Sequence, residues 1–166
     1  MRRLWECKDW SAFLDTDCRK GIRLRFDKAV DKEVRRACKE YVFWLRTQYD
    51  FPMRVPIYFK ASKQVITSTG EKGSALFFGP YDKSIEPYIK VSVGDYQESL
   101  ERVGKDNALA GILHSITHEL SHYYQWIKDY DIDIEKSERQ AKYYATVIVE
   151  DYAETREHPQ KELSLS

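Results

Sequence analysis

The chain has 166 residues, and its 27 Lys and Arg residues balance its 27 Asp and Glu residues, so the formal net charge is zero. This length suits one domain that buries a core without disulfide staples. A balanced charge gives no overall field that would attract nucleic acid or an anionic membrane, so neither is an expected partner. The three cysteines, Cys7, Cys18 and Cys38, have no CxxC pairing and indicate neither a disulfide framework nor a cysteine-based zinc site.

The cysteine usage and the N-terminus favour a reducing, cytoplasmic location. No long apolar run follows the first residues, which argues against a secretory signal peptide. No stretch approaches the roughly 20 apolar residues that a helix needs to span a bilayer. We expect a single domain over residues 1–166, with residues 1–20 as an N-terminal arm or helix and residues 157–166 as a flexible tail.

Four segments have the pattern of β-strands. In the first, apolar and charged residues alternate, and this period of two predicts a strand with one buried face. The others are short apolar or alternating runs close to Pro or Gly. The predicted strands cover residues 22–26, 55–60, 75–78 and 89–93. Residues 61–73 carry Ser, Thr, Lys and two Gly, and they predict a loop or an irregular hairpin.

Four segments have the pattern of helices, because their apolar residues recur at intervals of three and four. The predicted helices cover residues 32–49, 96–103, about 107–127 and 136–152. Asp31 is positioned to cap the first of them, and Asp106 or Asn107 to cap the long third one. The fold class is therefore α+β, with a small mixed sheet of about four strands packed on helices.

The third helix carries the stretch His118-Glu119-Leu120-Ser121-His122, an HExxH motif. Residues four apart on a helix lie one turn apart on the same face, so both imidazoles can bind one metal ion, with Glu119 beside them. A catalytic zinc site keeps three protein ligands and leaves the fourth position for water. The motif therefore requires a third ligand from elsewhere in the chain.

Glu138 is the preferred third ligand, because it lies sixteen residues beyond His122 near the start of the last helix. The small residues Ala141 and Ala145 would let that helix approach the motif helix closely. Other acids are close enough in sequence to remain alternatives. In order of preference they are Glu135, then Asp131 and Asp133.

The other histidines are weaker candidates. His114 and His122 lie about two helical turns apart, roughly 11 Å, which is too far for both to bind one ion together with His118. We therefore interpret His114 as a wall of the cleft or as a group behind the ligands. His158 falls in the predicted tail.

Together, His118–His122 and the segment Glu138–Ala145 resemble the zincin metallopeptidases. The similarity is greatest to the gluzincin branch and its small intracellular ImmA/IrrE-like members, in which a Glu begins a helix that has Ala three residues on. The resemblance implies one zinc ion bound by His118, His122 and Glu138, with Glu119 as general base. It also implies a zincin-like fold in which the motif helix is followed by a helix that bears the third ligand.

One position departs from the family pattern. Many gluzincins carry an acid four residues after the third ligand, where this chain has Lys142. Such an acid would orient a motif histidine from behind. Glu150 and Asp151 are the candidate replacements.

We expect a zinc-dependent metallopeptidase that hydrolyses peptide bonds of a protein or peptide substrate, with a metal-activated water and Glu119 as general base. Candidate donors to the developing oxyanion are Tyr143 and Tyr144, with Tyr152 as a further option. In the resembling fold the substrate pairs with an edge strand. That strand corresponds here to Ala75, Leu76, Phe77 and Phe78, whose two adjacent Phe rings must lie on opposite faces of the sheet.

The alternative is a zincin-fold binding or regulatory protein with a structural or latent zinc site and no turnover. In that case the cleft, or the basic face around Arg35 and Arg36, would engage a partner. Glu119 favours the enzyme, because a structural site would not need a general base. The physiological substrate and the oligomeric state leave no mark in the sequence.

Overall fold

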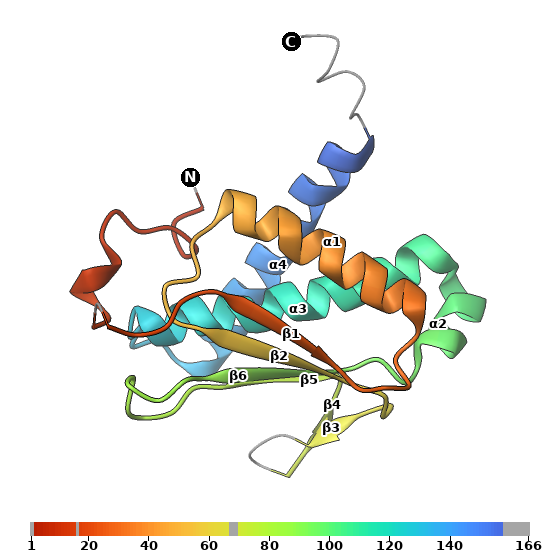
Figure 1. Cartoon of the computed structure of the whole chain (residues 1–166), viewed down its shortest axis with the longest axis horizontal. Helices are drawn as coiled ribbons and strands as arrows, with labels where there is room; N and C mark the ends of the chain where they lie inside the picture. Colours follow the sequence, from red (N-terminus) through yellow and green to blue (C-terminus); the bar gives the residue numbers. More distant parts are fainter. Residues whose placement is uncertain (1, 16, 67–69, 158–166) are drawn as a thin grey trace, which may run out of the picture.

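The computed structural model describes residues 2–15, 17–66 and 70–157, and its centre is a four-stranded mixed sheet with helices on one side (Figure 1). The strands are β1 (Ile22–Phe26), β2 (Val55–Lys60), β5 (Ala75–Phe78) and β6 (Tyr88–Ser92). Their order across the sheet is β1-β2-β6-β5. Strands β1, β2 and β6 run parallel, whereas β5 runs antiparallel to β6. The α+β class is confirmed, and β5 is an edge strand, as expected.

The helices are α1 (Lys32–Gln48), α2 (Tyr96–Val103), α3 (Lys105–Ile127) and α4 (Ile134–Glu157). Asp31 caps α1 as predicted, since its side chain accepts a hydrogen bond from the amide of Glu33. The predicted caps of α3 were wrong, because Asp106 and Asn107 lie inside its first turn. The preceding residue is Gly104 with a φ of 85°, a left-handed conformation that glycine adopts at little cost.

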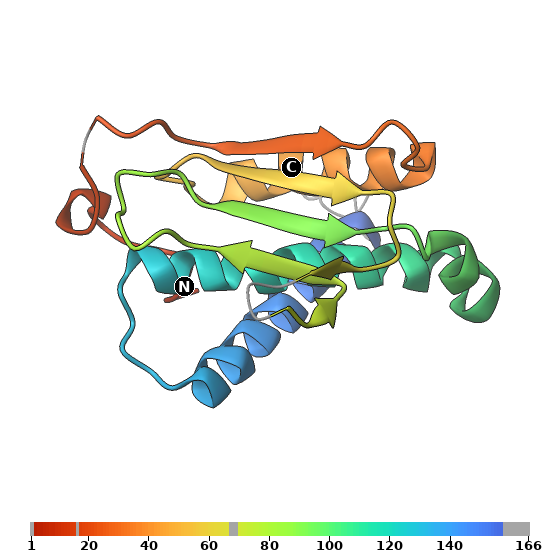
Figure 2. The same cartoon turned by 90° about the horizontal axis from the view of Figure 1, so that it is seen from below.

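A small hairpin connects β2 to β5. Its strands are β3 (Val65–Ile66) and β4 (Lys72–Gly73), which pair antiparallel and confirm the irregular hairpin expected between residues 61 and 73. The hairpin lies on the side of the sheet away from the helices (Figure 2). The predicted tail beyond Glu157, which includes His158, lies outside the described residues. Within the part of the chain that the structure describes, no helix has the length and apolar character needed to cross a membrane.

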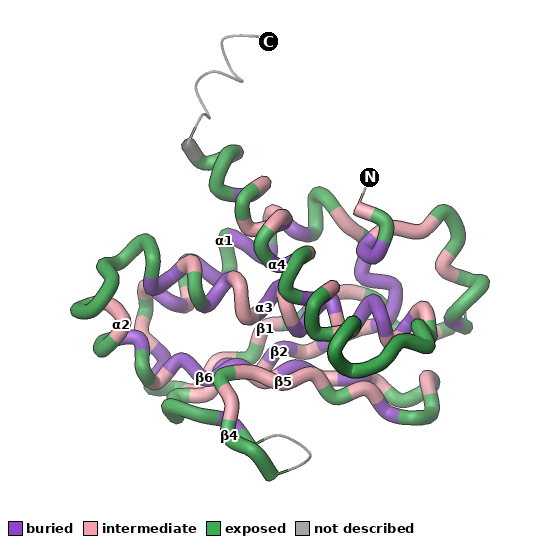
Figure 3. Tube along the Cα trace, turned by 180° about the vertical axis from the view of Figure 1, so that it is seen from behind, coloured by how far each residue is buried: buried purple, intermediate pink, exposed green. Residues whose placement is uncertain are grey.

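The N-terminal arm is part of the core. Leu4 is 1% exposed and Trp5 is fully buried, and the Trp5 indole N–H donates to the hydroxyl of Ser121 in α3 at 3.0 Å. A short 3₁₀ helix follows at Trp10–Ala12. Buried residues run along α3, whereas the connection at 129–133 is exposed (Figure 3). The predicted arm therefore packs directly behind the motif.

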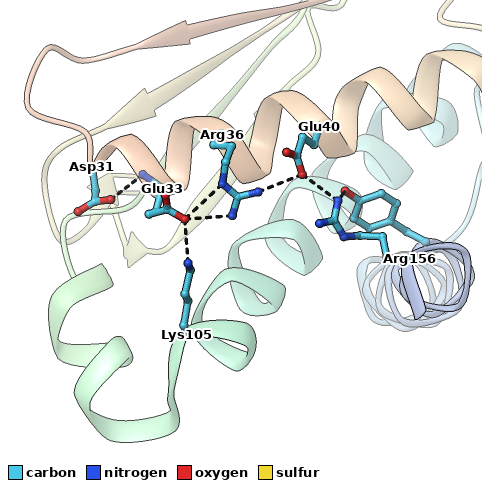
Figure 4. Close-up of polar contacts among 7 residues, drawn as sticks. Asp31, Glu33, Arg36, Glu40, Lys105 and Arg156 are labelled. Atoms are coloured by element: carbon cyan, nitrogen blue, oxygen red, sulfur yellow. Dashed lines mark hydrogen bonds and ion pairs between the residues drawn. The ribbon is translucent and has the colours of Figure 1, made fainter. Parts of the chain in front are cut away.

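A surface network of charges joins three helices (Figure 4). Glu33 of α1 pairs with Arg36 and with Lys105 at the start of α3, each at 3.0 to 3.1 Å. Glu40 of α1 pairs with Arg36 and with Arg156 near the end of α4. Exposed pairs of this kind typically contribute less than about 1 kcal/mol each. The network therefore supports the orientation of α1 over the other two helices without dominating stability.

Candidate metal centre

The structure brings His118, His122 and Glu138 together. The Nε2 of His118 lies 2.9 Å from Oε2 of Glu138, and the Nε2 of His122 lies 3.0 Å from Oε1 of the same carboxylate. One potential ligand atom from each residue lies within 4.8 Å of the other two. The two imidazole rings meet edge to face, with centroids 5.0 Å apart. Two nitrogens from one helix and a carboxylate from the next therefore converge on one point.

This donor set fits a metal ion. Two imidazole nitrogens and a carboxylate form one of the ligand sets found in catalytic zinc sites, with metal–ligand bonds of about 2.0 to 2.2 Å. At a tetrahedral angle, such bonds place neighbouring ligand atoms about 3.3 Å apart. The separations of 2.9 and 3.0 Å join the two histidines to different oxygens of Glu138. With one ligand atom from each residue, the three atoms lie within 4.8 Å of one another, so the cluster can hold a metal ion after the side chains adjust.

Gln125 fixes the orientation of His122. The Gln125 amide nitrogen donates to the carbonyl of Ser137 at 3.0 Å and to Oε1 of Gln140 at 2.8 Å, which settles which end of the amide is the oxygen. That oxygen accepts the Nδ1–H of His122 at 2.8 Å and the hydroxyl of Ser137 at 2.7 Å. With its proton on Nδ1, His122 presents the Nε2 lone pair to the site.

The back of α3 is anchored by buried hydrogen bonds. The Thr117 hydroxyl bonds to Tyr41 of α1, and Ser121 accepts the Trp5 indole N–H. The Tyr123 hydroxyl accepts the amide of Met53 at 3.0 Å. The buried side of α3 is therefore held by hydrogen bonds at Thr117, Ser121 and Tyr123, and the two histidines project from a helix that the core supports.

Glu119 is 8% exposed and lines the same cleft as His122 and Glu138. Burial, assisted by the negative charge of Glu138, raises the pKa of the Glu119 carboxyl group to about 8. A bound cation would act in the opposite direction by favouring the carboxylate. Glu119 is therefore placed to accept and release a proton beside the cluster.

Burial also lowers the pKa of His118, with a further contribution from the neighbouring His122. The pKa of His114 is lowered by burial and by the nearby charge of Lys142. A neutral imidazole is the form that binds a metal. The environment of His118 therefore favours its ligand form.

A cleft of about 590 Å³ joins the cluster to the edge strand. One wall is β5, and the other contains Glu119, His122 and Glu138. The rest of the lining comes from Tyr88 and Lys90 of β6, Ser137 of α4 and three isoleucines, Ile66, Ile132 and Ile134. Because β5 is paired on one side only, its other backbone edge is available beside the cluster.

The two adjacent Phe rings of β5 lie on opposite faces of the sheet, as predicted. Phe77 packs toward the helices, with ring centroids 6.4 Å from Tyr123 and 6.1 Å from Trp126. Phe78 stacks on Tyr88 at 5.1 Å. One ring therefore belongs to the core and the other to the opposite face.

The alternative acids do not join the cluster. The side chain of Glu135 is 87% exposed and lies 3.7 Å from Arg139. The Asp133 carboxylate accepts the amide of Lys136 at 2.8 Å and so caps the first turn of α4. Asp131 is exposed in the connection. Of the acids considered from the sequence, only Glu138 reaches the histidines.

The three tyrosines predicted as oxyanion donors are not among the residues that line the cleft. The Tyr144 hydroxyl accepts the amide of Leu4 at 3.2 Å, and Tyr143 is 60% exposed beside it. Tyr152 is buried against Tyr41, and its role as an oxyanion donor also stays a prediction. The predicted roles of Tyr143 and Tyr144 stay predictions without a supporting contact.

His114 is likewise turned to another partner. Its Nε2 lies 3.2 Å from the hydroxyl of Thr146 on α4. It lies one turn before His118 on α3 but does not line the cleft. Its predicted contact with substrate also stays a prediction.

Neither of the predicted replacements supplies the carboxylate that many gluzincins carry at the position of Lys142. Asp151 forms a two-pronged pair with Arg2, with contacts of 2.9 and 3.1 Å, and Glu150 is exposed. Gln125 fills the role instead, and sequence reasoning missed it. Its position three residues after His122, on the same helix face, was the available signal.

Comparison with protein-family models, with curated proteins and with solved structures finds no match for this chain.

Proposed function

We propose that this protein is a zinc-dependent metallopeptidase of the zincin type, similar to the gluzincins. The observation that carries the proposal is the convergence of His118, His122 and Glu138, with Glu119 lining the same cleft. A cluster of ligands alone would also suit a structural site. A buried carboxyl group beside the ligands is what hydrolysis requires in addition.

Each residue has a role in the proposed reaction. His118, His122 and Glu138 would hold the zinc ion, which supplies Lewis acidity and an activated water when bound. Glu119 takes the proton of the attacking water and returns it to the leaving nitrogen. Its burial keeps bulk water away from that proton transfer.

The edge strand β5 supplies the means of holding a substrate. An extended peptide can pair with the free backbone edge of β5 by strand addition, which places its carbonyl groups along the cleft. The apolar rim of Ile66, Ile132 and Ile134 would cover apolar side chains of such a peptide. The proposed substrate is therefore an extended stretch of protein or peptide.

The proposal is tested by metal analysis of the purified protein together with cleavage of an unfolded protein mixture. We expect one zinc ion per chain in the wild type and in Glu119→Gln. Cleavage should fall about 10²- to 10⁴-fold in Glu119→Gln, the typical contribution of a general base. Glu101→Gln, which removes an exposed carboxylate from α2, is the matched control and should cleave like the wild type.

Two outcomes would contradict the proposal. Protein without stoichiometric zinc would exclude the metal centre. Zinc-loaded protein in which wild type and Glu119→Gln show the same background cleavage would favour the binding or regulatory alternative.

A further inference from the structure

The face of the four-stranded sheet that turns away from the helices, which we call the open face, is not covered by any described helix; the connection between β2 and β5 lies over its Ser92 end, where Ser92 is 5% exposed and donates to the carbonyls of Lys63 and Ser74. Figure 2 looks onto this face, and in Figure 1 the helices α1, α3 and α4 all lie on the other side. Strand alternation and pairing register identify its residues. They are Arg23 and Arg25 on β1, Pro56, Tyr58 and Lys60 on β2, Tyr88, Lys90 and Ser92 on β6, and Leu76 and Phe78 on β5.

Aromatic rings form a row across three neighbouring strands of the open face. Tyr58 of β2 and Tyr88 of β6 have ring centroids 6.2 Å apart, and Tyr88 stacks on Phe78 of β5 at 5.1 Å. Phe78 is 41% exposed, and both tyrosines are partly exposed. Because Phe78 occupies one face of Tyr88, the surfaces left for a flat ligand to stack on are the other face of Tyr88 and the ring of Tyr58.

Cations flank this row. Arg23 and Arg25 are exposed on β1, and the described residues give neither of them an ion-pair partner. The ammonium groups of Lys60 and Lys90 lie 5.8 and 5.4 Å from the ring centroids of Tyr58 and Tyr88. None of the open-face positions holds an acid. Although the whole chain is neutral, this face is locally basic.

Acids border the open face on two sides and limit what can lie there. Asp27 follows β1 and lies 3.7 Å from Lys60. The acidic connection at 129–133 precedes α4, and its Ile132 lines the cleft along β5. An anionic ligand is therefore repelled at the β5 edge and attracted over β1, β2 and β6.

We propose that the open face binds single-stranded nucleic acid. Bases would stack on Tyr58 and Tyr88, and phosphates would lie near Arg23, Arg25 and Lys90. Stacking on aromatic side chains within a basic groove is the general mode of single-strand recognition, and exposed aromatics on a four-stranded sheet are one of its known forms. A duplex keeps its base faces stacked on one another, and an acidic peptide gains little from the aromatic row.

The proposal is tested by fluorescence anisotropy of the full chain with a labelled oligothymidylate of about 12 nucleotides. We expect saturable binding that weakens with salt, with a slope of about −0.7 for each phosphate neutralised. Tyr88→Ala should weaken binding roughly 5- to 160-fold, the range for loss of one stacked base. Tyr88→Phe keeps the ring face and should bind like the wild type.

Matched controls separate the open face from the rest of the surface. Phe43→Ala removes an aromatic ring that is 69% exposed on α1, and Arg139→Gln removes an exposed cation from α4; neither should change binding. Arg25→Gln should weaken binding and make the salt slope shallower by about 0.7. Thermal melting of each variant checks that it is folded.

Binding that is absent at low salt, or unchanged in Tyr88→Ala, would overturn the proposal. So would equal affinity for a duplex of the same length, or full displacement by a polyglutamate peptide, because either result would mean that charge alone is recognised. Tyr88 and Lys90 also line the cleft that contains Glu119, so the open face and the cleft meet at β5 and β6. Glu119→Gln should lose cleavage and still bind the oligonucleotide like the wild type, so the two measurements distinguish failure of this inference from failure of the proposed peptidase activity.

Discussion

The two helices that form the metal cluster are supported very differently. Helix α3 is held from behind by buried contacts, including those of Thr117 with Tyr41 and Ser121 with Trp5. Helix α4 begins directly after an exposed connection (Figure 3). The side chain of its ligand Glu138 is 56% exposed. The histidine half of the site is therefore preorganised by the core, whereas the carboxylate half depends on how α4 packs.

Gln125 connects the two halves. It lies on α3, yet its amide contacts Ser137 and Gln140 of α4 as well as His122. Closer to the middle of α4, the fully buried Ala141 and Ala145 allow the two helices to pack closely. If this division is correct, changes on the α4 side should alter metal affinity, and changes behind α3 should alter stability.

The largest expected effect is that of Glu138→Ala on zinc affinity. Loss of a direct ligand should lower the affinity by more than the roughly 10- to 100-fold that removal of an outer partner costs. Glu135→Ala, one turn earlier on the same helix, is the control and should bind zinc like the wild type, because its carboxylate is exposed and paired only with Arg139. Competition with a chromophoric chelator measures the zinc affinity of both variants. A larger loss of affinity in Glu135→Ala than in Glu138→Ala would mean that α4 packs against α3 in a different position.

A second test concerns the cost of burying Glu119 on the front of α3. In metal-free protein its carboxyl pKa is raised to about 8, so the folded state holds a proton that the unfolded state releases near pH 4.5. The contribution of Glu119 to the free energy of unfolding is therefore fully present below about pH 4.5 and is lost as the pH rises toward 8. At pH 7 the free energy of unfolding is about 3 kcal/mol lower than it would be below pH 4.5 because of this group. Melting in the presence of a chelator should show Glu119→Gln becoming more stable than wild type over this range.

The outcome that would contradict this expectation is a constant difference in melting temperature between the two proteins from pH 5 to pH 8. Constancy would mean that the Glu119 carboxyl group is hydrated in the metal-free protein. The site would then be less enclosed on its α3 side than the 8% exposure of Glu119 indicates.

The sequence was sufficient for the parts of the molecule that depend on local patterns. The period of two located β1 and β2 to the residue, and the HExxH spacing located both histidines. The position of Glu138 near the start of the last helix favours it over Glu135, which lies one turn earlier or in the connection. Ala141 and Ala145 predict close helix packing, and both are fully buried.

What could not be predicted depends on contacts between distant segments. Nothing in the sequence of residues 2–6 shows that Trp5 donates to Ser121 behind the motif. The partner of Asp151 could not be read from its own helix, because it is Arg2 at the other end of the chain. The start of α3 was misplaced because Asp106 is a good cap by type, whereas Gly104 ends α2 and begins α3 at once.

The link between the two halves is tested by Gln125→Leu. Without the amide oxygen, the Nδ1–H of His122 loses its acceptor at 2.8 Å and keeps only the Ser137 hydroxyl at 3.4 Å, so the imidazole is held less firmly and zinc affinity should fall about 10- to 100-fold. Gln125→Glu keeps an acceptor in place and should retain more affinity than Leu. Gln48→Leu on α1 is the control for the loss of an amide at an exposed position. Equal affinity in wild type and Gln125→Leu would show that His122 needs no support from Gln125.

The smallest effect is expected from Ser121→Ala, which acts behind α3. The change leaves the Trp5 indole N–H buried without its acceptor, at a cost of roughly 1 to 3 kcal/mol. For a chain of this size that corresponds to a fall in melting temperature of about 2 to 12 °C. Ser115→Ala, whose hydroxyl bonds only to the carbonyl of Gly111 one turn back, should change stability by less than about 0.5 kcal/mol. Zinc affinity should be the same in both variants, because the ligands face the other side of the helix; a loss of affinity in Ser121→Ala alone would mean that the N-terminal arm positions the histidines as well as stabilising the fold.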